Sequence, residues 1–173
     1  MPEQRSTTSR TVAVLFVCLG NICRSPMAEA IFRHQVEQAG LSRTITSDSA
    51  GTGAWHVGNP PHLGTRRVLL KHGLTTAHVA RVVTQNDFTR FDYLIAMDRD
   101  NLRDLRSMGG GAAARVALLM DFAQASGTTD IPDPYYDRRF EETYTLIDQG
   151  CRGLLEQIIG TLRLPNTTLP NTK

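Results

Sequence analysis

The chain contains few of the features that identify several common classes of protein. Its 173 residues include only three cysteines, an odd number without the spacing of a disulfide framework, which favours a reducing compartment. No apolar run approaches the roughly 18 residues of a membrane-spanning helix, and the N-terminus lacks the apolar core of a signal peptide. A formal net charge of +2 is too small to indicate binding to nucleic acid or to a membrane. We therefore expect a cytoplasmic protein, although the sequence leaves export open.

Common motifs for binding nucleotides and metals are also absent. The sequence contains neither the G-x-G-x-x-G pattern of a dinucleotide site nor the G-K-[ST] of a Walker phosphate loop. Cys18 and Cys23 are too far apart for a C-x-x-C pair, and no second cluster of cysteine and histidine completes a four-ligand zinc site. The sequence therefore predicts no metal and no cofactor.

The most informative segment covers residues 12–29, VAVLFVCLGNICRSPMAE. Its apolar run ends at Cys18, which predicts a strand covered on both faces. Pro26 opens a helical pattern, and Ser25 before it is a suitable N-cap. Between strand and helix, residues 19–24 include a glycine and an asparagine and are expected to form a tight loop.

Such a loop would direct several backbone N–H groups and the positive end of a helix at one small volume. A tetrahedral oxyanion binds in this geometry. The same groups, together with Arg24, would stabilise Cys18 as a thiolate nucleophile. A cysteine followed six positions later by an arginine is a weak pattern by itself, and Cys18 could instead be a buried thiol at a strand end. The strand, loop and helix start around it favour phosphate chemistry.

Short apolar strands alternate with helical patterns along the rest of the chain. Strands are predicted at residues 12–17, 44–49, 92–97 and 116–120, and helices from residue 26 to Gly40, at residues 63–72, from Arg99 and from Phe140. This order predicts an α/β fold: one domain over residues 11–164 with an open four-stranded parallel sheet, helices on both faces and polar tails at 1–10 and 165–173. Ligands of such folds bind beyond the carboxyl ends of the strands, where Cys18 would lie.

A thiolate that attacks a phosphoryl group needs a proton donor for the departing oxygen. Asp133 is the best candidate, because prolines on both sides stiffen its loop and Tyr135 beside it could line a site; the alternative is a surface turn. Asp98 follows the third strand and would lie at the same edge, or would cap the strand end or pair with Arg99. Trp55, in a glycine-rich loop, is suited to stack on a planar substrate or to be partly buried.

Six segments that span nearly the whole chain carry a family likeness: VLFVCLGNICRSPMAEAIF at 14–32, SAGTGAWHVGNPP at 49–61, HVAR at 78–81, FDYLIAMD at 91–98, NLRDL at 101–105 and DPYY at 133–136. In these segments the chain resembles the low-molecular-weight protein tyrosine phosphatases, a family that also includes thiol-dependent arsenate reductases. The arsenate chemistry needs further cysteines between the middle helix and the third strand, and residues 73–100 contain none. A catalytically dead phosphotyrosine-binding module would lack the nucleophile, the arginine or the acid, and all three are present.

The resemblance implies a role for each residue of the loop. Cys18 becomes a phosphocysteine, Arg24 binds the phosphate in a bidentate manner, and Asp133 acts as general acid and then as base. Ser25 would hydrogen-bond the thiolate and ease its departure. The implied phosphate-binding loop consists of Leu19, Gly20, Asn21, Ile22, Cys23, Arg24 and Ser25.

The resemblance also implies the surroundings of the loop and the reaction. The residues around the loop that would hold it in place are Asn21, Ser49, His78 and Asp98. The cleft for a phosphotyrosine ring would be walled by Leu19, Ile22, Trp55, Tyr135 and Tyr136, with tryptophan in place of the tyrosine often found there. Cys23 would form a reversible disulfide with Cys18, or else be a small buried residue. We expect a monomer or weak dimer that dephosphorylates phosphotyrosine proteins and aryl phosphates without a metal.

Overall fold

The computed structural model describes residues 10–109, 111, 114–124 and 126–162. Of the two predicted tails, residues 1–9 and 165–173 lie outside these ranges. The described chain contains one sheet of four parallel strands in the order β2-β1-β3-β4. The strands are β1 (Val12–Cys18), β2 (Ile45–Gly51), β3 (Tyr93–Ala96) and β4 (Arg115–Leu118). The predicted fold class is confirmed.

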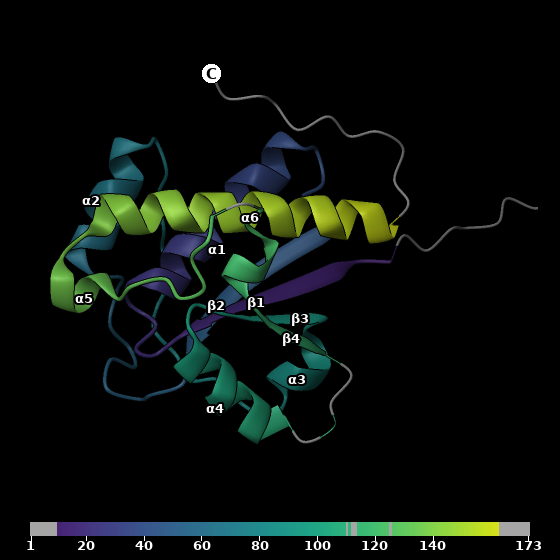
Figure 1. The fold of residues 1–173 in the computed structure, drawn as a ribbon, viewed down its shortest axis with the longest axis horizontal. Helices are drawn as coiled ribbons and strands as arrows, with labels where there is room; N and C mark the ends of the chain where they lie inside the picture. Colours follow the sequence, from purple (N-terminus) through teal and green to yellow (C-terminus); the bar gives the residue numbers. More distant parts are fainter. Residues whose placement is uncertain (1–9, 110, 112–113, 125, 163–173) are drawn as a thin grey trace, which may run out of the picture.

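Helices cover both faces of this sheet (Figure 1). The helices are α1 (Arg24–Gln38), α2 (Leu63–Lys71), α3 (Asp87–Arg90), α4 (Arg99–Gly109), the 3-10 turn η1 (Leu119–Phe122), α5 (Pro134–Asp137) and α6 (Phe140–Leu162). In Figure 1, α1 and α6 lie above the strands, whereas α3 and α4 lie below them. None of the helices in the described ranges is long and apolar enough to cross a membrane.

Strand β1 is buried on both faces, which accounts for its continuous apolar sequence. Val14 and Phe16 belong to the core formed with α1 and α6, and Leu15 and Val17 belong to the core formed with α3 and α4. All four side chains are fully buried. Because the central strand is fixed from both sides, the loop that follows Cys18 starts from a rigid position.

Helix α6 approaches η1 closely, and its glycines permit the approach. A Cβ atom on Gly153 would lie 1.8 Å from the carbonyl oxygen of Phe122, and one on Gly150 would lie 2.6 Å from the Leu119 side chain. Glycine lowers helix stability by roughly 1 kcal/mol relative to alanine, so its presence here is explained by packing. On the same helix, Cys151 is fully buried.

Two local predictions need correction, and two short helices were missed. Helix α1 begins at Arg24, and no side chain caps it, so Ser25 lies in its first turn and is not the N-cap. The fourth strand ends at Leu118 because residues 119–122 turn into η1 instead of continuing the sheet. Helices α3 and α5 were not predicted, since four residues are too few to show a helical period.

Candidate active site

The loop at residues 19–23 leaves the carboxyl end of β1 and is held from outside by the segment that follows β2. The N–H groups of Thr52 and Gly53 donate to the carbonyl oxygens of Cys18 and Leu19, each at 2.9 Å. Gly51 is paired with Cys18 in the sheet, and a Cβ atom there would lie 2.8 Å from the Leu19 carbonyl oxygen. The close approach of the two segments therefore requires a glycine at this position.

The backbone N–H groups of residues 19–24 are available to a ligand. None of them donates a hydrogen bond to any residue in the described ranges. Asn21 has a φ of +56°, and a change of backbone hand of this kind lets successive N–H groups point inward together. The N-terminus of α1 adds its positive end to the same point. The loop thus has the form of a binding site for a phosphate-like anion.

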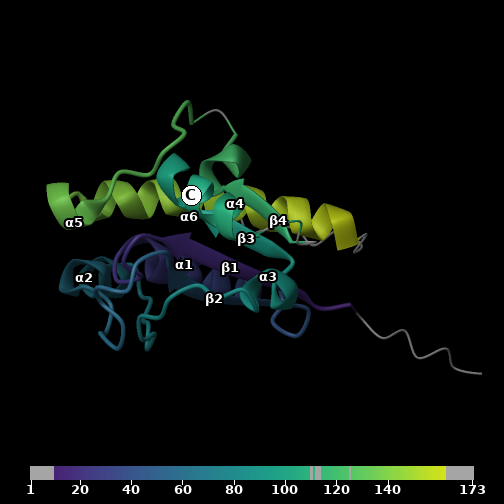
Figure 2. The same cartoon turned by 90° about the horizontal axis from the view of Figure 1, so that it is seen from below.

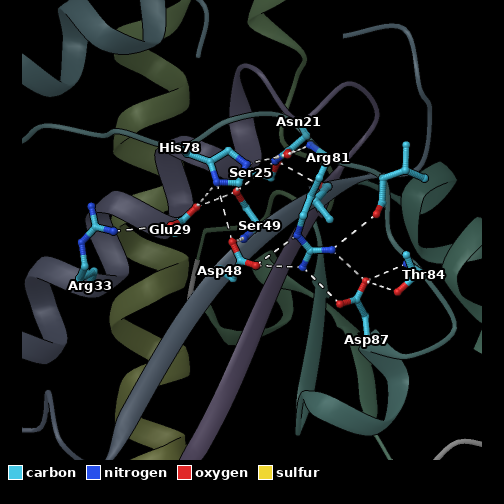
Figure 3. A network of polar contacts seen from close by, with 12 residues as sticks. Asn21, Ser25, Glu29, Arg33, Asp48, Ser49, His78, Arg81, Thr84 and Asp87 are labelled. Carbon is cyan, nitrogen blue, oxygen red and sulfur yellow. Dashed lines mark hydrogen bonds and ion pairs between the residues drawn. The ribbon is translucent and has the colours of Figure 1, made fainter. Parts of the chain in front are cut away.

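The side chain of Asn21 holds the loop in this conformation through four hydrogen bonds (Figure 3). Its amide nitrogen donates to the hydroxyls of Ser25, at 2.8 Å, and Ser49, at 3.0 Å. Its amide oxygen accepts from Nε2 of His78, at 2.7 Å, and from the backbone N–H of Arg81, at 2.9 Å. A left-handed conformation is unfavourable for most residues, and these bonds offset its cost.

A set of charged groups supports this network from behind. Ser49 donates to a carboxylate oxygen of Glu29 at 2.7 Å, and the same oxygen lies 3.2 Å from Nδ1 of His78. Burial raises the pKa of Glu29, and the hydrogen bond from Ser49 opposes the rise. Glu29, Asp48 and His78 bring three potential metal ligands within 4.8 Å of one another. Because Ser49, Asn21 and the arginine described next already engage all three, we assign them to the support of the loop.

Arg81 connects this group to the other side of the sheet. Its guanidinium donates to Asp48 at 2.9 Å and to Asp87 at 3.0 Å, and Asp87 also accepts from the backbone N–H of Thr84 at 2.7 Å (Figure 3). Arg81 therefore ties the segment after α2 to both β2 and α3. The hydrogen bonds from Arg81 and Thr84 lower the pKa of Asp87 against the opposing effect of its burial.

Arg24 directly follows the loop, and its side chain is only 3% exposed. One terminal nitrogen donates to Asp98 at 2.7 Å and to the carbonyl oxygen of Ile131 at 2.8 Å, and the other donates to Asp133 at 3.3 Å. Its Nε is buried and has no partner among the described residues. The guanidinium is thus fixed by two carboxylates and retains a free donor.

In both Asp98 and Asp133, the two carboxylate oxygens make different contacts. One oxygen of Asp98 contacts Arg24 and the other accepts from the backbone N–H of Asn101, at 2.8 Å, near the start of α4. Arg99 pairs with Asp130, at 3.0 Å, so the alternative of an Asp98–Arg99 pair is wrong. Asp133 caps α5 through one oxygen and faces Arg24 with the other. It is therefore both a turn residue and a residue of the site.

A cleft of about 320 Å³ opens at the loop. It is lined by Cys18, Leu19, Gly20, Ile22, Cys23, Trp55, His56, Asp133, Tyr135 and Tyr136. Trp55 is 74% exposed, which excludes the alternative of a partly buried packing residue. The cleft therefore brings together a thiol, a carboxyl group and several aromatic rings.

A family model for the low molecular weight phosphotyrosine protein phosphatases matches residues 13–163 of the chain. The chain belongs to this family. YfkJ of Bacillus subtilis, a low molecular weight protein-tyrosine-phosphatase, is 50% identical over 149 residues, 85% of this chain and 96% of YfkJ. The crystal structure of YfkJ has a TM-score of 0.86 to this phosphatase at 48% identity, covering 89% of this chain and 98% of that one.

More distant members show the same likeness. The human low molecular weight phosphotyrosine protein phosphatase is 42% identical over 152 residues, 85% of this chain and 96% of the human protein. The crystal structure of DARP, an arginine phosphatase of Drosophila, has a TM-score of 0.80 at 37% identity and covers 84% of this chain and 96% of that one. As a member of the family, the chain is a protein tyrosine phosphatase, a cysteine-dependent hydrolase.

The phosphatase contains residues near its site that the sequence did not reveal. His56 lines the cleft with its ring centroid 5.8 Å from that of Tyr135, yet a single histidine in a loop gives no signal of this. Glu29 and Arg81 are ordinary charged residues in the sequence and become part of the network only through partners far along the chain. The HVAR segment at 78–81 was the available clue to Arg81.

Proposed function

We propose that this phosphatase hydrolyses phosphotyrosine in proteins, and small aryl phosphates, with Cys18 as the nucleophile. The observation that carries the proposal is the shared cleft: the Cys18 thiol and the Asp133 carboxyl group line it together with the rings of Trp55 and Tyr135. An aryl phosphate has a flat ring on one side and a tetrahedral anion on the other. The cleft offers aromatic walls to the first and unpaired N–H groups to the second.

In the first step, the Sγ atom of Cys18 attacks phosphorus while the bond from phosphorus to the tyrosine oxygen breaks. Asp133 transfers its proton to that oxygen, and a phosphocysteine remains. The N–H groups of residues 19–24 and the guanidinium of Arg24 hold the three other phosphate oxygens as charge develops on them. Bound phosphate would take over the Arg24 nitrogen that now faces Asp133, leaving the carboxyl group free for proton transfer.

In the second step, water attacks phosphorus, Asp133 takes a proton from it, and the bond between phosphorus and sulfur breaks. The departing thiolate needs a hydrogen-bond donor, and the Ser25 hydroxyl lies 3.0 Å from Cys18 Sγ. Because the Asn21 amide already donates to the Ser25 oxygen, the hydroxyl proton of Ser25 is left for an acceptor, and the sulfur at 3.0 Å is nearer than the Ala50 carbonyl oxygen at 3.4 Å. The position of Ser25 inside the first turn of α1 thus has a chemical purpose that a cap would not serve.

A test of the proposed substrate compares three peptides of the same sequence that carry phosphotyrosine, phosphoserine or phosphoarginine. We expect kcat/KM to be highest for phosphotyrosine, by about ten-fold or more, because only its ring fills the aromatic cleft. EDTA should leave the rate unchanged. A higher kcat/KM for phosphoarginine would overturn the assignment and place the chain with DARP in substrate choice.

We also propose that the phosphatase acts in the cytoplasm and that its activity responds to oxidation. Cys18 and Cys23 are both buried free thiols, five positions apart in one tight loop. Burial and the neighbouring Cys18 raise the pKa of Cys23 to about 12, so that Cys23 is protonated at neutral pH. A peroxide would oxidise Cys18 to the sulfenic acid, and Cys23 would condense with it to form a disulfide and release water. A dithiol then restores both thiols.

The oxidation proposal predicts how inactivated enzyme recovers. After peroxide treatment, wild-type enzyme should regain most of its activity with dithiothreitol, whereas Cys23→Ser should regain about one fifth or less, because its sulfenic acid is oxidised further. Cys151→Ala removes the third thiol, which does not line the cleft, and should recover like the wild type. Equal recovery of Cys23→Ser and wild type would show that Cys23 does not protect Cys18.

A further inference from the structure

A second hollow of about 720 Å³ adjoins the catalytic cleft, and Tyr135 lines both. The hollow lies between α2 and the start of α6. Figures 1 and 2 place α2 and α5 at the same end of the molecule. The residues of this groove used below are His62, Arg67, Lys71, Tyr135, Arg138, Phe140 and Glu141.

The groove carries an excess of positive charge. Its one acidic side chain, Glu141, is already paired with Lys71 at 2.6 Å and with His72 at 3.1 Å. Arg67 and Arg138 are exposed, and neither forms an ion pair with another residue of the described ranges. Two guanidinium groups therefore remain available at the groove.

The titration of a neighbouring histidine is consistent with this charge. His62 caps α2 and also lines the groove. Burial lowers its pKa first, and the positive charges of Arg138 and Arg66 lower it further. The uncharged ring of His62 stacks on Phe140, with centroids 5.2 Å apart, which provides a flat floor beside the two guanidinium groups.

We propose that this groove binds carboxylate side chains of the substrate protein that lie close to the phosphotyrosine. The inference rests on the proposed function, since it assumes a phosphotyrosine seated in the adjoining cleft. Arginine binds carboxylates in a bidentate manner, and the groove and the cleft share Tyr135 as a wall residue, so the two sites are neighbours. Arg67 and Arg138 thus select substrates in which acidic residues flank the phosphotyrosine on the side that faces α2.

The test uses three phosphotyrosine peptides of equal length. The first peptide has two aspartates before the phosphotyrosine, and the second has two aspartates after it. The third, neutral peptide has asparagines in place of these aspartates. On wild-type enzyme, we expect one of the acidic peptides to have a kcat/KM about five-fold above the neutral peptide, as two exposed ion pairs provide. The advantage should shrink about two-fold or more when the salt concentration rises from about 0.05 to 0.5 M.

The deciding variant combines Arg67→Gln with Arg138→Asn, because asparagine tolerates the left-handed backbone at position 138, where φ is +59°. We expect this variant to lose the preference for the acidic peptide. The matched control, Arg103→Gln with Arg106→Gln, removes two exposed charges from α4 and should keep the preference. Circular dichroism and the rate with p-nitrophenyl phosphate verify the folding and chemistry of both.

Each outcome decides a different statement. An equal kcat/KM for all three peptides on wild type, or a preference that survives in the groove variant, would overturn the role of the groove and leave the phosphatase activity intact. Failure to hydrolyse any of the phosphotyrosine peptides would instead contradict the proposed function. If the α4 control loses the preference equally, net charge explains the preference, and the role of the groove in substrate binding is overturned.

Discussion

Replacement of Cys18 by serine is expected to reduce turnover of p-nitrophenyl phosphate to less than about one hundredth of the wild-type rate, while phosphate or vanadate still binds. The hydroxyl of serine stays protonated at neutral pH and attacks phosphorus far more slowly than a thiolate. The proposed anion site consists of the N–H groups of residues 19–24 and of Arg24, none of which the substitution removes. Cys18→Ser should therefore lose catalysis and keep anion binding.

The binding half of this prediction has a direct optical signal. Trp55 is the single tryptophan of the chain and lines the cleft, so its fluorescence should respond to vanadate in wild type and in Cys18→Ser alike. Cys151→Ala serves as the matched loss of a buried thiol, and we expect it to retain activity. Residual turnover above about one hundredth in Cys18→Ser would remove Cys18 from the role of nucleophile.

The parts of the site that could be predicted from sequence are those that lie within one short segment. Cys18, Arg24 and Ser25 are spaced within eight residues, and the strand before them is apolar because both of its faces are covered. Once the strand and the helix are recognised, the loop between them has little freedom. The parallel sheet then determines at which edge the loop lies.

Ser25 shows why local rules fail at such a site. A serine before a proline is a favourable N-cap by propensity, yet its hydroxyl lies between the Asn21 amide and the Cys18 thiol instead. No side chain caps the start of α1, and the N–H groups of residues 19–24 donate to no other residue of the described ranges. A site that binds an anion through its backbone must avoid the very bonds that local propensity favours.

The supporting charges could not be predicted because their partners are distant in sequence. Glu29 reaches Ser49 from α1, and Arg81 joins Asp48 of β2 to Asp87 of α3. Each of these residues is of a type that is usually exposed, and a sequence without structure gives no reason to pair them. These residues come together behind Asn21 only in the folded protein (Figure 3).

If Asp133 is the general acid, as we propose, its substitution should have an effect that depends on the leaving group. We expect Asp133→Asn to lower kcat/KM for phenyl phosphate by about 100-fold or more, but for p-nitrophenyl phosphate by only about ten-fold. The p-nitrophenolate ion is a good leaving group and departs without a proton, whereas the leaving oxygen of phenyl phosphate must be protonated and departs as phenol. Asparagine still offers an oxygen to the Tyr135 N–H, so the cap of α5 is preserved and the lost proton is isolated as the cause. A series of substituted phenyl phosphates measures the dependence.

Asp98→Asn is the appropriate control, because Asp98 also contacts Arg24 but does not line the cleft. If Asp98 only positions the guanidinium, its substitution should lower the rate for every leaving group by a similar factor. The ratio between phenyl and p-nitrophenyl phosphate then stays as in wild type. An equal loss across leaving groups in Asp133→Asn would make Asp133 a positioning residue as well, and the proton donor would have to be sought elsewhere on the rim of the cleft. A steep dependence confined to Asp133→Asn assigns the proton to this carboxyl group.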